Sequence, residues 1–159
     1  MSTRKYDDAS WHYEGEYPKN LPIEHASIFI GMFLKWCIER NLVSEELLED
    51  EQETINLIKS NKATGATLLW NALDGKLTEE ELNDTGNAFA LAYYEYDSDF
   101  AKEYCDYCTD FSNAFDKKAK DSGFEYESAY HVEDTLENYL FIKNIIDKRY
   151  RQWKSTYNK

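Results

Sequence analysis

Hydrophobic residues recur at helical spacing through most of the chain. Between residues 23 and 41 they occupy nearly every side of a helix, which predicts a central helix buried on all faces. From residue 135 to 154 they recur in steps of three and four, which predicts an amphipathic helix: Leu136, Tyr139, Ile142, Ile146, Tyr150 and Trp153. No alternation of apolar and polar residues runs long enough for a large sheet.

Between these two long helices, residues that cap helix N-termini predict several shorter helices. Ser44 and Thr64 are side chains that cap helix N-termini, and they predict helices at 45–60 and 65–73. Thr78 and Glu81 have the spacing of a capping box, which predicts a helix from Thr78 to about Tyr96. Within that helix Gly86 indicates a close helix crossing.

One further helix is predicted to begin at Asp97 or Ser98. Its apolar side chains recur in steps of four, four, three and four: Phe100, Tyr104, Cys108, Phe111 and Phe115. An exposed loop is expected to follow this helix. Near 124–132 we expect a short two-stranded ribbon in an otherwise helical chain. Residues 1–22 are expected to form an extended arm, with Trp11, Tyr13 and Tyr17 packed on the core. The fold class is therefore all-α, a single domain over 1–159 with about six helices in a bundle.

The chain is strongly acidic. Its 159 residues carry 31 Asp and Glu against 18 Lys and Arg, a net charge of −13. This field repels phosphate backbones, so we expect no nucleic acid ligand, whereas it attracts basic proteins and speeds their encounter. Plain solubility is the alternative explanation of the charge.

Three cysteines, an odd number, favour a reducing compartment: Cys37, Cys105 and Cys108. The first residues contain no apolar signal segment, and the longest apolar stretch is interrupted by charged residues. We therefore expect a cytoplasmic protein that is neither exported nor inserted into a membrane.

No motif in the sequence names a reaction. His12, His25 and His131 do not have the spacing of metal ligands, so we expect no metal, no cofactor and no catalytic residues. Cys105 and Cys108 have C-x-x-C spacing, but in mid-helix we expect Cys108 in the core and Cys105 partly exposed. The alternative is a small metal-dependent hydrolase that uses His131 with nearby carboxylates, Glu133 or Asp134, or with His12.

Tyrosines and acidic residues alternate in the second half of the chain, and such a surface could bind a basic protein. The residues expected to bind the partner are Glu95, Tyr96, Asp99, Glu103, Asp106, Tyr107, Asp110, Glu125 and Tyr126. On one helix, the carboxylates from Asp99 to Asp110 would project from one side as an acidic ridge. Glu95 would join that ridge if the break near Asp97 is slight. In the alternative interpretation half of the tyrosines are core residues and the acids are a solvated face.

Several segments carry a family resemblance. These are Lys5-Tyr-Asp-Asp-Ala-Ser-Trp-His-Tyr13 with Tyr17-Pro18, then Ile30-Gly-Met-Phe33, Thr85-Gly-Asn-Ala-Phe-Ala-Leu-Ala-Tyr-Tyr94 and Tyr130-His-Val-Glu-Asp-Thr-Leu-Glu-Asn-Tyr139. Together they resemble a bacterial family of uncharacterised small acidic proteins, whose members resemble the immunity proteins of polymorphic or contact-dependent growth-inhibition toxins. The resemblance implies a cytoplasmic inhibitor dedicated to one toxin domain.

The sequence thus predicts an immunity protein that occludes the active site of a toxin domain with an acidic, tyrosine-rich surface. Many such toxins are basic nucleases, which agrees with the charge. A small hydrolase and a scaffold that associates with itself through the aromatic N-terminal arm remain the alternatives.

Overall fold

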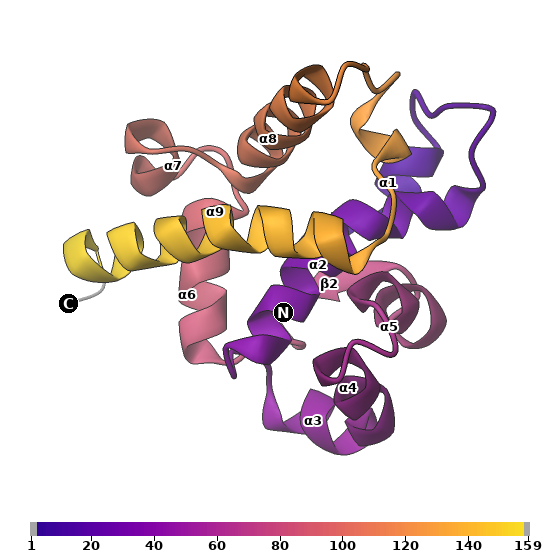
Figure 1. The fold of residues 1–159 in the computed structure, drawn as a ribbon. Helices are drawn as coiled ribbons and strands as arrows, with labels where there is room; N and C mark the ends of the chain where they lie inside the picture. The colour runs from indigo at the N-terminus through magenta and orange to yellow at the C-terminus, as the bar shows by residue number, and fades with distance from the viewer. Residues whose placement is uncertain (1–2, 158–159) are drawn as a thin grey trace. The chain divides into compact units, whose positions relative to one another are not determined.

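Helices make up most of the structure, a computed structural model that describes residues 3–157 (Figure 1). Within the chain two compact units can be described, Met1–Asn87 and Ala88–Lys159. The first unit contains β1 (Lys5–Asp8), α1 (Ala9–Tyr13), η1 (Ile23–His25), α2 (Ala26–Glu39), α3 (Glu45–Asp50), α4 (Gln52–Lys59), α5 (Gly65–Ala72) and β2 (Lys76–Thr78). Helix α6 (Asp84–Tyr93) leads into the second unit, which contains α7 (Asp99–Glu103), α8 (Tyr107–Asp121), η2 (Ala129–His131) and α9 (Leu136–Thr156). None of the described helices combines the length and the apolar composition needed to cross a membrane.

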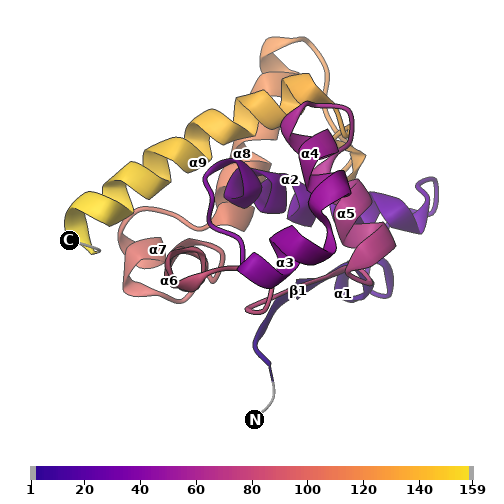
Figure 2. The ribbon, with the colours of Figure 1, turned by 90° about the horizontal axis from the view of Figure 1, so that it is seen from below.

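Helix α2 is the centre of the first unit, as its apolar sequence predicts. From residue 26 to 38 every side chain except Phe29 is buried. Helix α5 packs directly against it (Figure 2). At the crossing, a Cβ on Gly65 would lie 1.8 Å from the carbonyl oxygen of Gly31, and a Cβ on Gly31 would lie 2.3 Å from the amide nitrogen of Ala66. The two backbones are therefore in contact, and no side chain fits at either glycine.

The predicted caps of two helices in this unit are confirmed. Ser44 Oγ accepts the Leu47 N–H at 3.2 Å, and Thr64 Oγ1 accepts the Thr67 N–H at 3.2 Å. The single helix predicted for 45–60 is wrong, because Glu51 leaves the helical region with φ −124° and ψ 30°. The chain there forms α3 and α4 in succession.

The capping box at Thr78 forms its hydrogen bond without starting a helix. Glu81 Oε1 accepts the Thr78 N–H at 2.7 Å, but Thr78 lies in β2, which pairs antiparallel with β1. Helix α6 begins six residues later, where Asn83 Oδ1 accepts the Gly86 N–H at 2.9 Å. Pairing with β1 thus holds Thr78 extended, and the predicted helix start is wrong.

The first unit also holds the sheet that was expected elsewhere. The strands of the described residues are β1 and β2, whereas the segment 124–132, predicted to be a ribbon, contains the 3₁₀ turn η2.

Gly86 lies in close contact with the chain that follows α2. A Cβ at this position would lie 2.3 Å from the Leu42 carbonyl oxygen. The close backbone approach predicted at Gly86 is confirmed, but the segment that approaches it is a loop and not a helix.

The N-terminal arm is more ordered than an extended segment, since it forms β1 and α1. Asp8 caps α1 by accepting the Ser10 N–H at 2.9 Å, and its other carboxylate oxygen pairs with Lys5 at 2.7 Å. Asp7 Oδ1 lies 2.7 Å from His12 Nε2. The prediction that Trp11 packs in the core is wrong: its side chain is 56% exposed, with the Lys5 ammonium 5.0 Å from its ring centre.

In the second unit α9 lies where the sequence predicts it. Thr135 Oγ1 caps it by accepting the Asn138 N–H at 3.1 Å, and its predicted apolar stripe is largely buried, except for Leu136. The rings of Phe111 and Phe115 on α8, 4.7 Å apart, belong to the core of this unit. Cys108, expected beside them, is exposed.

We expect Gly65→Ala to destabilise the first unit by about 3 kcal/mol, because its Cβ would overlap the Gly31 carbonyl and separate α2 from α5. Gly15→Ala is the control, since the nearest atom to a Cβ there, the Trp11 carbonyl oxygen, is 3.4 Å away. Urea unfolding followed by circular dichroism measures both. Equal stability of the two variants would contradict a backbone contact at the crossing.

We also expect the Asp8 carboxylate to contribute to acid sensitivity. Burial raises the pKa of this carboxyl, but the hydrogen bonds from Lys5 and Ser10 outweigh burial and hold the pKa below its usual value. A lowered pKa contributes stability that is present above the unfolded value of about pH 3.9 and is lost as the pH falls through the folded pKa. Asp8→Asn, which keeps a good N-cap, should therefore lower stability at neutral pH and flatten its decline below about pH 4. Asp50→Asn, at an exposed position, should leave both unchanged in urea unfolding across this pH range.

Candidate partner-binding surface

The structure places all the residues predicted to bind a partner in the second unit, but in three different environments. Glu95, Tyr96, Asp99, Glu103 and Asp106 lie before, on and after α7; Tyr107 and Asp110 lie inside the unit; Glu125 and Tyr126 follow α8. Helix α8 separates the first group from the last by about 22 Å, at 1.5 Å per residue. The residues therefore do not form one continuous surface.

The acidic ridge predicted for one long helix does not form, because two capping side chains divide that helix. Ser98 Oγ caps α7 by accepting the Ala101 N–H at 2.9 Å. Asp106 Oδ1 caps α8 by accepting the Thr109 N–H at 2.9 Å. Asp99 and Asp110 therefore belong to different helices, and the spacing between them carries no information about a shared face.

Asp110 is the centre of a buried polar cluster and not a surface carboxylate. Its side chain is 8% exposed, and it receives two hydrogen bonds from Arg149, from Nε at 2.8 Å and from Nη2 at 3.0 Å. Tyr93, which is fully buried, donates its hydroxyl to the same carboxylate at 2.7 Å. Tyr107 is also buried, with its ring centre 5.9 Å from that of Tyr93. Neither Asp110 nor Tyr107 is therefore exposed to a partner, and their assignment to the binding surface is corrected.

The ionisation of this cluster follows from its burial. Burial, and then the Asp110 carboxylate, raise the pKa of Tyr93 well above its usual value. The hydrogen bond to Asp110 raises the pKa of Arg149. Burial, followed by Asp110, raises the pKa of Cys105 to about 11, so this thiol stays protonated at neutral pH. The C-x-x-C pair is not in mid-helix, because Cys105 lies just before α8 and Cys108 lies in its first turn. The raised pKa of Cys105 disfavours the thiolate that redox chemistry requires at that residue.

Four exposed residues around α7, together with the half-buried Glu95, form what we call the α7 acidic surface: Glu95, Tyr96, Asp97, Asp99 and Glu103. Tyr96 is 77% exposed, more than any other large hydrophobic side chain among the described residues. Glu103 accepts a hydrogen bond from the hydroxyl of Tyr157, a bond that raises the pKa of Tyr157 to about 12. The ring of Tyr157 also packs edge-on against Phe100 at 5.6 Å, so the chain after α9 holds α7 in place.

A cavity of about 440 Å³ lies at the other end of α8 and includes Glu125 and Tyr126. Helix α8 ends in a Schellman motif, in which the Gly123 N–H bonds the Lys120 carbonyl at 3.1 Å and the Phe124 N–H bonds the Ala119 carbonyl at 2.9 Å. Gly123 has φ +82°, a conformation that glycine adopts without strain. The chain thereby turns back beside α8, and we call the resulting cavity the α8 C-terminal pocket; its lining residues are Asp116, Lys120, Phe124, Glu125 and Tyr126.

The sequence pointed to Glu125 and Tyr126 but not to the rest of this pocket. Asp116 and Lys120 lie one turn apart on α8, and Phe124 is the first residue after the turn. The available signal was Gly123 directly after a helical run, which marks a chain reversal at this place.

His131, the histidine proposed for a hydrolase, is held by neighbouring polar side chains. His131 Nδ1 lies 2.9 Å from Ser128 Oγ, and its Nε2 lies 3.3 Å from a Glu127 oxygen. Glu133, expected beside His131 in a hydrolase, accepts the Tyr126 hydroxyl at 2.8 Å. In the part of the chain that the structure describes, no three His, Cys, Asp or Glu side chains are grouped as metal ligands would be.

Comparison with known proteins identifies the family. A family described as a domain of unknown function (DUF7832) matches residues 5–132. The chain belongs to this family. The match includes β1, with which the N-terminal motif begins, and extends through η2, so it covers both the α7 acidic surface and the α8 C-terminal pocket. No curated protein and no solved structure matches the chain at a significant level.

We expect Asp110→Asn to destabilise the second unit by about 3 kcal/mol, because Arg149 would keep its charge without a counter-charge in a largely buried position. Asp99→Asn removes the same charge from an exposed position and should change stability by less than about 0.5 kcal/mol. Urea unfolding followed by circular dichroism measures both effects. A small effect of Asp110→Asn would show that Arg149 is stabilised by water instead.

Proposed function

We propose that this protein is an immunity-type inhibitor that binds a basic toxin domain and blocks access to its active site. The observation that carries the proposal is Tyr96, 77% exposed within the α7 acidic surface. Residues 94–106 contain five acidic residues and one basic residue. A tyrosine among carboxylates offers contact area with little loss of side-chain entropy, together with acceptors for Lys and Arg.

Charge supports the same proposal from another direction. A net charge of −13 accelerates encounter with a basic protein, and local carboxylates then orient the complex. Correct placement of α7 depends on the contacts of Tyr157 with Glu103 and Phe100. A surface held in place before binding loses less entropy on association than a mobile one.

The decisive experiment pairs recovery of a partner with a biological readout. The tagged protein is used to capture the product of the adjacent upstream gene, at low and at moderate salt, with mass spectrometry to identify it. The same product is then expressed alone and together with this protein. Growth arrest that is relieved by co-expression supports the immunity function, whereas failure of the two proteins to associate contradicts it.

We expect the triple variant Asp97→Asn, Asp99→Asn, Glu103→Gln to slow association with that partner about tenfold at low salt, with a smaller salt dependence. The matched control is Glu45→Gln, Glu46→Gln, Glu49→Gln, which removes the same charge from exposed positions on α3. Stopped-flow association rates compare the two. If both variants slow association equally, the net charge and not the α7 acidic surface determines the rate.

A further inference from the structure

We propose that the α8 C-terminal pocket receives an arginine side chain of the protein partner. This inference rests on the proposed function and adds to it the chemistry of one contact. Carboxylate and aromatic side chains line this pocket, which lies at the opposite end of α8 from the α7 acidic surface.

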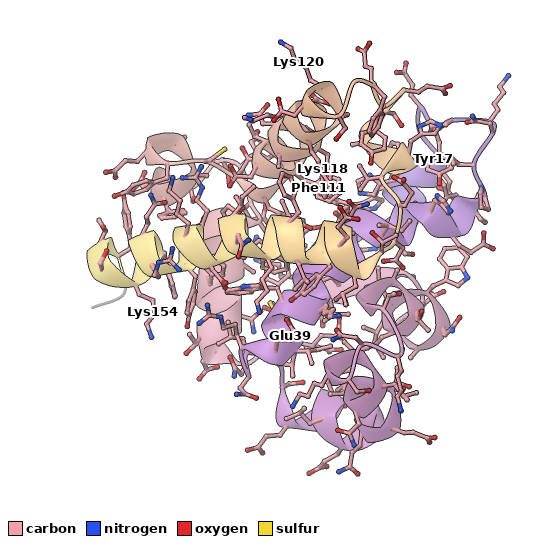
Figure 3. The ribbon with its side chains drawn as sticks, viewed as in Figure 1. Tyr17, Glu39, Phe111, Lys118, Lys120 and Lys154 are labelled. Carbon is pink, nitrogen blue, oxygen red and sulfur yellow. The ribbon has the colours of Figure 1, made fainter. Side chains whose placement is uncertain are left out.

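In the described part of the chain, the pocket's two carboxylates make no ion pair with a lysine or an arginine. Among the described residues, neither Asp116 nor Glu125 makes an ion pair, although Lys120 lines the same cavity. The neighbouring lysines of α8 are paired: Lys117 with Asp121 at 2.7 Å and Lys118 with Glu137 at 3.6 Å. Lys120 extends away from the end of the helix (Figure 3). The pocket therefore combines two unpaired negative charges with a lysine that does not neutralise them.

Two aromatic residues form one wall of the pocket: Tyr126 is held in place by a hydrogen bond, and Phe124 is accessible to solvent. Tyr126 donates its hydroxyl to Glu133 at 2.8 Å, and burial followed by this hydrogen bond raises its pKa to about 12, so the residue stays neutral. Phe124 packs edge-on against the Tyr126 ring, with ring centres 5.0 Å apart, and is 49% exposed. The Schellman motif fixes where Phe124 leaves the helix.

Arginine fits these two walls better than lysine does. A guanidinium group stacks on aromatic rings and donates paired hydrogen bonds to carboxylates at the same time, whereas an ammonium group is compact and strongly hydrated. The volume of about 440 Å³ falls within the range of about 300–1,000 Å³ found for ligand pockets. A single extended side chain can enter such a cavity while the partner's backbone stays outside.

The test uses the whole protein and a blocked peptide, acetyl-Gly-Arg-Gly-amide, with acetyl-Gly-Lys-Gly-amide as comparison. Titration followed by ¹⁵N–¹H correlation spectra should shift the amide signals of residues 116–126 with the arginine peptide, and more weakly with the lysine peptide. Phe124→Ala and Glu125→Gln should each weaken arginine binding about two- to fivefold. Asp121→Asn, which removes an exposed acid outside the pocket, should leave binding unchanged.

Lys120→Gln provides a test with the opposite sign. Removing this positive charge should tighten arginine binding about two- to fivefold, because the Lys120 ammonium lines the same cavity and repels an incoming guanidinium group. Equal binding of the two peptides, shifts that avoid 116–126, or no gain in Lys120→Gln would each overturn the inference. Because no partner is needed here, failure of the pocket is distinguishable from failure of the immunity function, which the co-expression experiment tests separately.

Discussion

Backbone contact between α2 and α5 is the constraint on which the first unit depends. Gly31 and Gly65 bring two helices closer than any side chain would allow. That closeness buries α2 on nearly every side and makes its continuous apolar sequence favourable. The sheet of β1 and β2 then joins the N-terminal motif to the chain that follows α5. Because close-packed interiors adjust little, one added methyl group at the crossing affects every element packed on α2.

In the second unit, the hydrogen bonds of the Asp110 carboxylate hold the helices together, as the backbone contact of α2 and α5 does in the first. Asp110 connects α8 to α9 through Arg149 and to α6 through Tyr93, so three helices meet at one carboxylate. Aromatic rings enclose this cluster, with Tyr93 between Phe89 at 5.3 Å and Tyr107 at 5.9 Å. A buried ion pair of this kind costs desolvation energy, which the paired hydrogen bonds from Arg149 and the hydroxyl of Tyr93 offset. Asp110, one of the acidic residues that the sequence predicts to bind a partner, thus stabilises the fold instead.

The two surfaces that we propose for recognition of a partner lie at the two ends of α8. At one end, capping by Ser98 and Asp106 produces the short helix α7 and exposes Tyr96 among carboxylates. At the other end, Gly123 reverses the chain and forms a pocket with aromatic and acidic walls. Both features arise from helix termini, where backbone geometry changes and side chains are not required for packing. Two separated contacts would also fix the orientation of a bound protein, which a single charged patch cannot do.

The sequence by itself determined the helical class, the central position of α2, the caps Ser44 and Thr64, and the amphipathic α9, because these features depend on local spacing and hydrophobicity. It could not locate the sheet, since β1 and β2 are far apart in the chain, and their pairing overrode the capping box at Thr78. It also could not distinguish buried from exposed acids: Asp99 and Asp110 have the same side chain in the same acidic segment. Only the tertiary structure brought Arg149, 39 residues further along the chain, to Asp110 and thereby decided which carboxylate stabilises the fold and which faces solvent.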